Sequence, residues 1–138
     1  MLKIAICEDN EIFIEIIKTN LETILNVPYK LDSFFSGREF LKAISENACS
    51  YDLVFLDIEL EDKSISGIDL GQMINNRNPQ TQLIFISQYL EYASDVYATK
   101  HTYFINKSRL NDYMTDALHT ALNNLDTDRR QYLIFKVK

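Results

Sequence analysis

The sequence predicts a single α/β domain in which helices cover both faces of a doubly wound, five-stranded parallel sheet. Two apolar runs, LVFL at 53–56 and LIFI at 83–86, lack the alternation of a half-exposed strand and are typical of central parallel strands. Short apolar runs also alternate along the chain with longer segments of helical period, which gives five β-then-α units. A chain of 138 residues is long enough to bury the core of one such domain.

The expected strands and helices alternate along the chain. The first strand is the apolar run of Leu2, Ile4, Ala5 and Ile6, and the strands together are expected at 2–7, 30–35, 52–56, 82–87 and 102–105. Helices are expected between and after them, at 10–26, 37–47, 67–77, 89–99 and 109–126. The last helix has the clearest pattern, because its apolar residues recur on one face: Leu110, Tyr113, Met114, Ala117, Leu118, Ala121, Leu122 and Leu125.

The chain changes character after Leu125. The segment DTDRR at 126–130 is a charged break, and YLIFKVK at 132–138 alternates apolar and polar residues as a strand does. We therefore expect one domain over 1–126, followed over 127–138 by a linker and the start of a further, C-terminal domain.

Composition excludes several classes of function. The net charge of −6 disfavours direct contact with DNA or with an anionic membrane surface. No apolar run approaches the length of a membrane span, and no signal peptide is evident, so we expect a cytoplasmic protein. Cys7 and Cys49 have neither a CxxC motif nor a metal-ligand spacing, and we expect two thiols without a chemical role.

Acidic residues stand where two of the predicted strands end. Glu8 and Asp9 follow the first strand, and Asp57 follows the third. Because ligands of such sheets bind at the carboxyl ends of the strands, the three carboxylates are expected to share one crevice. Their mutual repulsion would raise at least one pKa, and a hard divalent cation such as Mg²⁺ would relieve it. The sequence therefore predicts a magnesium site at this edge.

The two remaining strands at this edge end in other polar groups. The fourth strand ends in Ser87, a hydroxyl, and the fifth is followed by Lys107, whose ammonium can reach an anion in the same crevice. A carboxylate nucleophile next to a metal, a hydroxyl and an ammonium suits phosphoryl transfer, because positioning and charge neutralisation supply most of that catalysis.

The motifs in this order resemble the receiver domain of two-component response regulators, over residues 1 to about 126. The matching pieces are ICEDN, YDLVFLDIEL, SGIDL, LIFIS and YFINKS. The stretch FISQYLEYASDVYATKHTYFINKS is most similar to receivers that precede a LytTR-type DNA-binding domain, and YLIFKVK is similar to the opening strand of that domain. The resemblance implies the flavodoxin-like (βα)5 fold.

The resemblance also implies a role for each residue of the crevice. Asp57 would be the phosphoacceptor, and Mg²⁺ would be held by Glu8, Asp9, Asp57 and the backbone carbonyl of Glu59. Ser87 and Lys107 would contact the phosphoryl oxygens, with Ser87 and the aromatic Phe104 as the switch residues. Such a domain is not an enzyme in the usual sense, since it catalyses only its own phosphotransfer and slow dephosphorylation.

Three departures from the family pattern affect these expectations. Ser108 follows Lys107 where most receivers have a proline after a cis peptide bond, and a cis bond is costlier before serine. The sequence leaves open whether this peptide is cis or trans, and a trans peptide would displace Lys107. The stretch after Asp57, IELEDKSIS at 58–66, is longer than usual and lacks the common proline, which predicts altered access to the site. Gln88 is larger than the residue usually found next to Ser87, and we expect it to hinder phosphodonors or attacking water.

The expected partners follow from the same resemblance. A sensor histidine kinase would donate the phosphoryl group, and DNA would be bound only by the C-terminal domain. A homodimer would form through the face of the fourth helix and fifth strand, which offers Tyr89, Tyr92, Tyr97 and Tyr103, although these aromatic residues could instead simply pack.

Two other functions are weighed against this one. A receiver-like binding module that dimerises without phosphorylation is the main alternative, and the presence of every site group argues against it. A hydrolase with an aspartyl-phosphate intermediate would need a general acid near Asp57, and the two histidines, His101 and His119, lie on segments that are unsuited to that role.

Overall fold

The computed structural model describes residues 1–46, 50–60 and 65–125, which form one five-stranded parallel sheet. The strand order β2-β1-β3-β4-β5 is that of a flavodoxin-like doubly wound sheet. The strands are β1 Leu2–Cys7, β2 Tyr29–Phe34, β3 Leu53–Asp57, β4 Gln82–Ser87 and β5 Tyr103–Asn106. The predicted fold class is therefore confirmed, with strand ends that differ by one residue at most from the expected ones.

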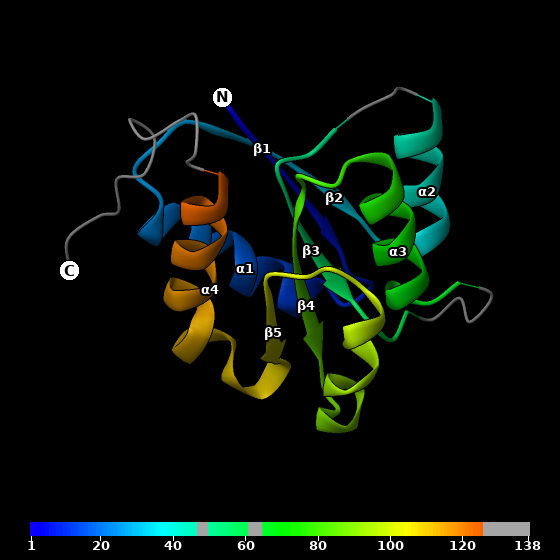
Figure 1. Ribbon diagram of the computed structural model, residues 1–138. Helices are drawn as coiled ribbons and strands as arrows, with labels where there is room; N and C mark the ends of the chain where they lie inside the picture. Colours follow the sequence, from blue (N-terminus) through cyan, green and yellow to red (C-terminus); the bar gives the residue numbers. More distant parts are fainter. Residues whose placement is uncertain (47–49, 61–64, 126–138) are drawn as a thin grey trace.

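Helices cover both faces of the sheet (Figure 1). One face carries α1 and α4 and the other carries α2 and α3. The helices are α1 Glu11–Ile24, α2 Gly37–Glu46, α3 Gly67–Arg77 and α4 Leu110–Leu125. None of the helices in the described ranges has the length and apolar character that a membrane crossing requires.

Each layer of helices closes its own apolar core. Beneath α1 and α4, Ile17, Leu21 and Met114 pack against inward side chains of the sheet such as Ile4 and Phe55. On the other face the corresponding core includes Phe40, Leu70, Leu56 and Phe85. β3 is buried along its whole length because it contributes alternate side chains to both cores. This rigid central strand ends at Asp57.

Two helices begin at defined caps beside the carboxyl ends of the strands. Asn10 caps α1, since its side-chain oxygen accepts a hydrogen bond from the Ile12 N–H at 2.9 Å. Ser66 and Asp69 form a reciprocal capping box at the start of α3. These caps fix where α1 begins after β1 and where α3 begins after β3.

The expected helix over 89–99 is wrong. In its place lie two short 3₁₀ helices, η1 Leu90–Ala93 and η2 Asp95–Ala98. Neither has a side-chain cap, and Val96 is the one buried residue between Leu90 and Ala98. Because most helix stability in proteins comes from packing an amphipathic face, a segment that buries one side chain has little to hold a full α-helix.

Some expectations fall on residues outside the described ranges. These are Cys49, most of the stretch after Glu59 (61–64), and the tail 126–138 with its expected linker and strand. Cys7 is described: it is buried, and burial together with the charge of Asp57 raises the pKa of its thiol. A thiol that resists ionisation is a poor nucleophile.

Candidate functional site

The carboxyl ends of β1 and β3 bring three acidic side chains together. One carboxylate oxygen from each of Glu8, Asp9 and Asp57 lies within 4.8 Å of the other two. Glu8 and Asp57 are fully buried, at 0% and 1% exposure, whereas Asp9 is half-buried. The strand pairing explains the meeting, because Cys7 is in register with Leu56 and places Glu8 next to Asp57. The predicted acidic crevice is therefore present.

Lys107 reaches into this cluster from the end of β5. Its Nζ donates a hydrogen bond to Asp57 Oδ2 at 3.0 Å and lies 2.7 Å from Glu8 Oε1. The ammonium also lies 4.7 Å from the centre of the Phe13 ring, a cation–π contact from the first turn of α1. Phe13 was not among the residues selected from the sequence, since nothing in the local pattern separates it from the core residues of the same helix.

Lys107 is not displaced from the crevice. Asn106 Oδ1 accepts a hydrogen bond from the Ser108 N–H at 3.0 Å and opens a short 3₁₀ turn, η3 Lys107–Arg109, that leads into α4. Lys107 is held within this turn and by its two acidic partners, so its position does not depend on a proline at 108.

Burial and charge perturb the titration of these groups. Burial, with the charge of Asp57, raises the pKa of Glu8 from 4.5 to about 7, although Lys107 opposes the shift. Burial also raises the pKa of Asp57 against the opposing effect of Lys107. For Lys107 burial lowers the pKa, but the two carboxylates outweigh it and leave the pKa above its ordinary value. The buried cluster carries more negative than positive charge when it is ionised.

This arrangement fits a hard divalent cation. Glu8 Oε1 is buried, and it shares its nearby cation, the Lys107 ammonium at 2.7 Å, with Asp57. Three carboxylates of one crevice supply hard oxygen ligands, which Mg²⁺ prefers. The donor set and the buried oxygen therefore fit a magnesium ion.

The chain after Asp57 turns back closely on itself. The Glu59 N–H donates to Asp57 Oδ1 at 3.1 Å, and the Gly67 N–H donates to the Ile58 carbonyl at 3.1 Å. A Cβ at Gly67 would lie 2.1 Å from the Asp57 carbonyl oxygen, so only glycine allows this approach. Asp57 is thus fixed through both carboxylate oxygens, Oδ1 by Glu59 and Oδ2 by Lys107.

The two predicted switch residues lie on the neighbouring strands. Ser87 is buried at the end of β4, and its Oγ accepts a hydrogen bond from the Tyr89 N–H at 3.0 Å. Phe104 is half-buried on β5 and packs against the core beneath α2 and α3. Gln88 is exposed beside Ser87, and its expected hindrance remains a prediction.

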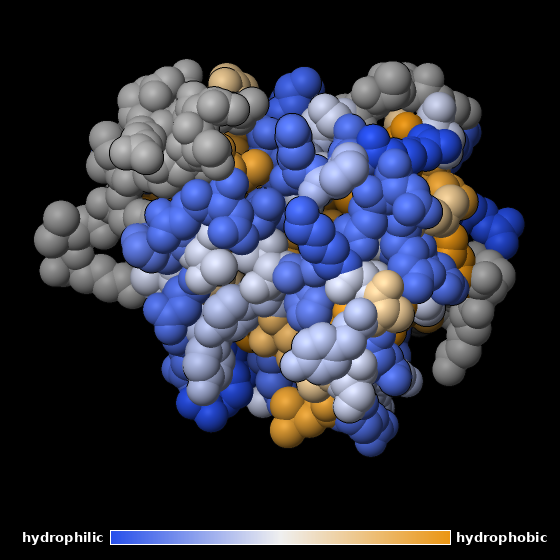
Figure 2. All heavy atoms as spheres, viewed as in Figure 1, coloured by the Kyte–Doolittle hydropathy of each residue, from blue (hydrophilic) through white to orange (hydrophobic). Residues whose placement is uncertain are grey.

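The aromatic residues near this edge differ in exposure. Tyr97 is 83% and Tyr89 43% exposed, whereas Tyr103 packs against the core of α1 and α4. Hydrophilic residues predominate on the face in Figure 2, and apolar ones reach the surface there in small separate spots. On the predicted dimer face, Tyr89 and Tyr97 are therefore exposed, whereas Tyr103 mainly packs against the core.

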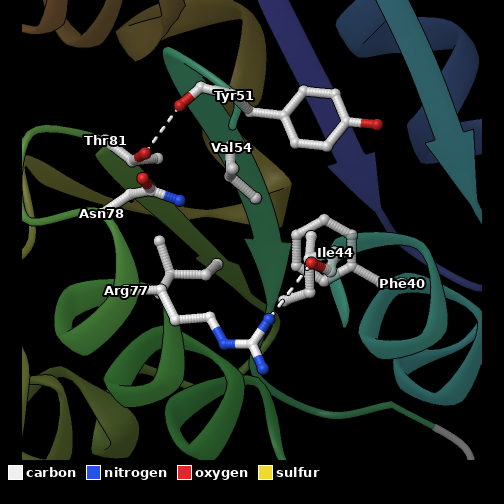
Figure 3. Close-up of a pocket in the computed structure, with 8 residues that line it drawn as sticks. Phe40, Ile44, Tyr51, Val54, Arg77, Asn78 and Thr81 are labelled. Atoms are coloured by element: carbon white, nitrogen blue, oxygen red, sulfur yellow. Dashed lines mark hydrogen bonds between the residues drawn. The ribbon is translucent and has the colours of Figure 1, made fainter. Parts of the chain in front are cut away.

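A cavity of about 350 Å³ lies at the opposite edge of the sheet, between α2 and α3 (Figure 3). Phe40, Ile44 and Val54 form its apolar walls, and Arg77 donates a hydrogen bond to the Ile44 carbonyl at 3.1 Å. Its residues include no carboxylate, and Thr81, which lines it, precedes β4, whereas Ser87 ends that strand. This cavity is separate from the acidic crevice.

The sheet order, the carboxylate cluster and the buried lysine together define an α/β domain that can hold a cation and an anion side by side. The chain belongs to the response regulator receiver domain family, whose model matches residues 4–122. It is therefore a signalling domain of response regulators.

Individual relatives agree with this assignment. Accessory gene regulator protein A of Staphylococcus aureus is 31% identical over 136 residues, which cover 90% of this chain and 55% of that protein. Sensory transduction protein LytR of Staphylococcus epidermidis is 29% identical over 112 residues, covering 79% and 41%. The chain thus spans about half the length of these relatives.

A solved structure is similar as well. The response regulator protein TrrA of Thermotoga maritima, in complex with Mg(2+)-BeF, superposes with a TM-score of 0.71 at 27% identity. The match covers 88% of this chain and 99% of TrrA. The receiver fold of this chain is therefore shared with a protein that was solved with magnesium and a fluoroberyllate.

Proposed function

We propose that Asp57 accepts a phosphoryl group from the phosphohistidine of a sensor kinase. A carboxylate oxygen of Asp57 attacks phosphorus as the P–N bond to the histidine breaks, and the leaving imidazole takes up a proton. The product is an acyl phosphate on Asp57. The observation that supports this best is the placement of a buried carboxylate 3.0 Å from the Lys107 ammonium and within 4.8 Å of two further acids.

The other residues of the crevice have separate tasks in this proposal. Glu8, Asp9, Asp57 and the Glu59 backbone carbonyl would hold Mg²⁺, which when bound supplies positive charge against the phosphoryl oxygens. Lys107 pairs with a phosphoryl oxygen, and the Ser87 hydroxyl donates to another. The same groups would allow water to hydrolyse the acyl phosphate slowly, which returns the Asp57 carboxylate and releases inorganic phosphate.

The test is the covalent state of the intact chain. Incubation with acetyl phosphate and Mg²⁺ is expected to add a single phosphoryl group, which intact-protein mass spectrometry detects. Excess chelator should prevent the addition, because the ionised carboxylates would then face an incoming anion with only Lys107 to balance them. Equal labelling with and without chelator would contradict the proposed role of the metal.

Phosphorylation would be read out as self-association. The surface proposed for it comprises η1, η2 and β5, where Tyr89 and Tyr97 are exposed. Two chains held together would raise the local concentration of attached DNA-binding domains. Such an output agrees with the name of the gene regulator relative, and a LytTR-type domain is the DNA-binding partner that we propose. The acidic receiver itself would not contact DNA.

Lys107→Ala is expected to separate labelling from switching. With saturating Mg²⁺ the parent should dimerise on addition of beryllofluoride, with a dissociation constant at least about ten-fold lower, whereas the variant should change by less than about two-fold. Sedimentation velocity measures both. Lys18→Ala, at a half-exposed lysine of α1, is the matched control and should behave like the parent. Equal activation of the variant and the parent would show that Lys107 is not the group that senses the phosphoryl.

A further inference from the structure

A tyrosine hydroxyl joins the loop after Asp57 to the η1 turn. Tyr92 Oη donates a hydrogen bond to Glu59 Oε1 at 2.7 Å, and the Tyr92 ring lies edge-on to Tyr89 with 6.2 Å between ring centres. The carboxylate also raises the pKa of the Tyr92 hydroxyl. Glu59 itself donates its N–H to Asp57 Oδ1, so an unbroken chain of contacts leads from the phosphoacceptor to η1.

The far end of the same segment is held by another helix. Asn75 of α3 accepts a hydrogen bond from the Lys100 N–H at 2.8 Å and donates its side-chain amide to the Lys100 carbonyl at 3.0 Å. Between these two attachments Val96 is the one buried residue of Leu90–Ala98. Val96 and the half-buried Tyr92 pack on the core beneath α2 and α3, and with so little buried surface the side-chain hydrogen bonds at the two ends contribute to where this segment lies.

Two contacts hold the end of the segment that lies near Asp57, one at Ser87 and one at Glu59, and a phosphoryl group on Asp57 would affect each of them. The Ser87 O–H donates a hydrogen bond to the Tyr89 carbonyl at 3.3 Å, and a phosphoryl oxygen on Asp57 would compete with that carbonyl for the hydroxyl proton. About −1.5 to −2 units of charge would also appear beside the Glu59 carboxylate, which Tyr92 holds. The paired hydrogen bonds between Asn75 and Lys100 involve no group of the crevice.

We propose that the Tyr92–Glu59 hydrogen bond is a latch that holds the Leu90–Ala98 segment against the phosphoacceptor loop, and that phosphorylation of Asp57 releases it. Tyr92 is then a positioning residue, and the segment moves about its attachment at Asn75 and Lys100. The release half of this inference rests on the proposed function of Asp57, whereas the holding half does not.

The consequences follow from linkage. If the latch is made only in the resting arrangement, its removal shifts the equilibrium toward the switched arrangement. The equilibrium constant should change by about three-fold, which corresponds to the loss of one exposed hydrogen bond. By reciprocity, the affinity for an activating ligand rises by the same factor. Tyr92→Phe is the suitable variant, because it deletes the hydroxyl and keeps the ring against Tyr89.

Hydrogen exchange of the full chain tests the holding half without any phosphoryl chemistry. In Tyr92→Phe the amides of 90–98 are expected to exchange about three-fold faster than in the parent. Glu59→Gln should fall between the two, because its amide oxygen still accepts the bond. Tyr97→Phe removes a hydroxyl from an 83% exposed ring of the same segment and should match the parent. Equal exchange in Tyr92→Phe and the parent would overturn the latch.

Beryllofluoride with Mg²⁺ tests the release half. In the parent it should raise the exchange of 90–98 to the level of Tyr92→Phe, and Tyr92→Phe should bind it about three-fold more tightly. Unchanged or slower exchange in the liganded parent would overturn the release while leaving the latch. A parent that binds no beryllofluoride would count against the proposed function of Asp57, and the exchange comparison without the ligand would still decide whether the latch exists.

Discussion

Asp57→Asn is expected to abolish labelling by acetyl phosphate. The carboxamide keeps the shape of the side chain but replaces the attacking carboxylate oxygen with a neutral group that is not a nucleophile at neutral pH. The effect should be all or none, because the other fully buried acid of the crevice, Glu8, follows β1 and is proposed to hold the metal and not the phosphoryl group. Intact-protein mass spectrometry on parent and variant, each with Mg²⁺, measures it directly.

The matched control for this variant is Asp52→Asn. Asp52 stands immediately before β3, at the opposite end of the strand from Asp57, and its carboxylate accepts a hydrogen bond from the Lys3 N–H. An asparagine oxygen can accept that bond, so the variant should fold and label like the parent. A label that persists in Asp57→Asn would place the phosphoacceptor elsewhere in the chain.

Glu8→Gln is expected to stabilise the metal-free domain at pH 7. The pKa of Glu8 is raised to about 7 by burial and by Asp57, so keeping this side chain ionised costs folding free energy. Removing its charge leaves Lys107 paired with Asp57, one cation with one anion. The gain in unfolding free energy is expected to be about 2 kcal/mol, with about 3 kcal/mol as its upper bound from the size of the shift.

The same shift sets the pH dependence. Since the pKa of Glu8 is higher in the folded state than its ordinary 4.5, the folded chain binds more protons between that value and about 7. The unfolding free energy of the parent should therefore fall as pH rises through this window, and the fall should be smaller in Glu8→Gln. Asp57, whose pKa is also raised, contributes in the same direction and keeps some of the slope in the variant.

Urea unfolding at pH 4.5, 6 and 7.5 in chelator measures these differences. Glu15→Gln, at a side chain with 63% exposure on α1, is the control and should follow the parent at each pH. Saturating Mg²⁺ should reverse the order of parent and Glu8→Gln, because the parent has the additional ligand and gains more from binding. A variant that is less stable than the parent at pH 7.5 in chelator would mean that the Lys107–Glu8 contact outweighs the burial of the charge.

The sequence predicts the sheet and the residues at its edge well. Strand periods and continuous apolar runs report burial directly, so the order of the elements follows from them, and Glu8, Asp57, Ser87 and Lys107 could be selected because each ends or follows a strand. The predicted helix at 89–99 is wrong because local sequence does not report how much of a segment its neighbours bury. Its composition permits a helix, but the amount of surface it buries depends on the neighbouring elements, and it buries only Val96.

What the sequence by itself determined is therefore the doubly wound sheet, the acidic crevice and membership of the receiver class, because these depend on residue type and spacing. Only the tertiary structure decided the interactions between segments far apart in the chain. It placed Lys107 on Glu8 and Asp57 despite Ser108, and it joined Tyr92 to Glu59. Distances of this kind set the pKa values and the hydrogen-bond partners, and local sequence carries no information on them, since the partners are separated by up to 99 positions.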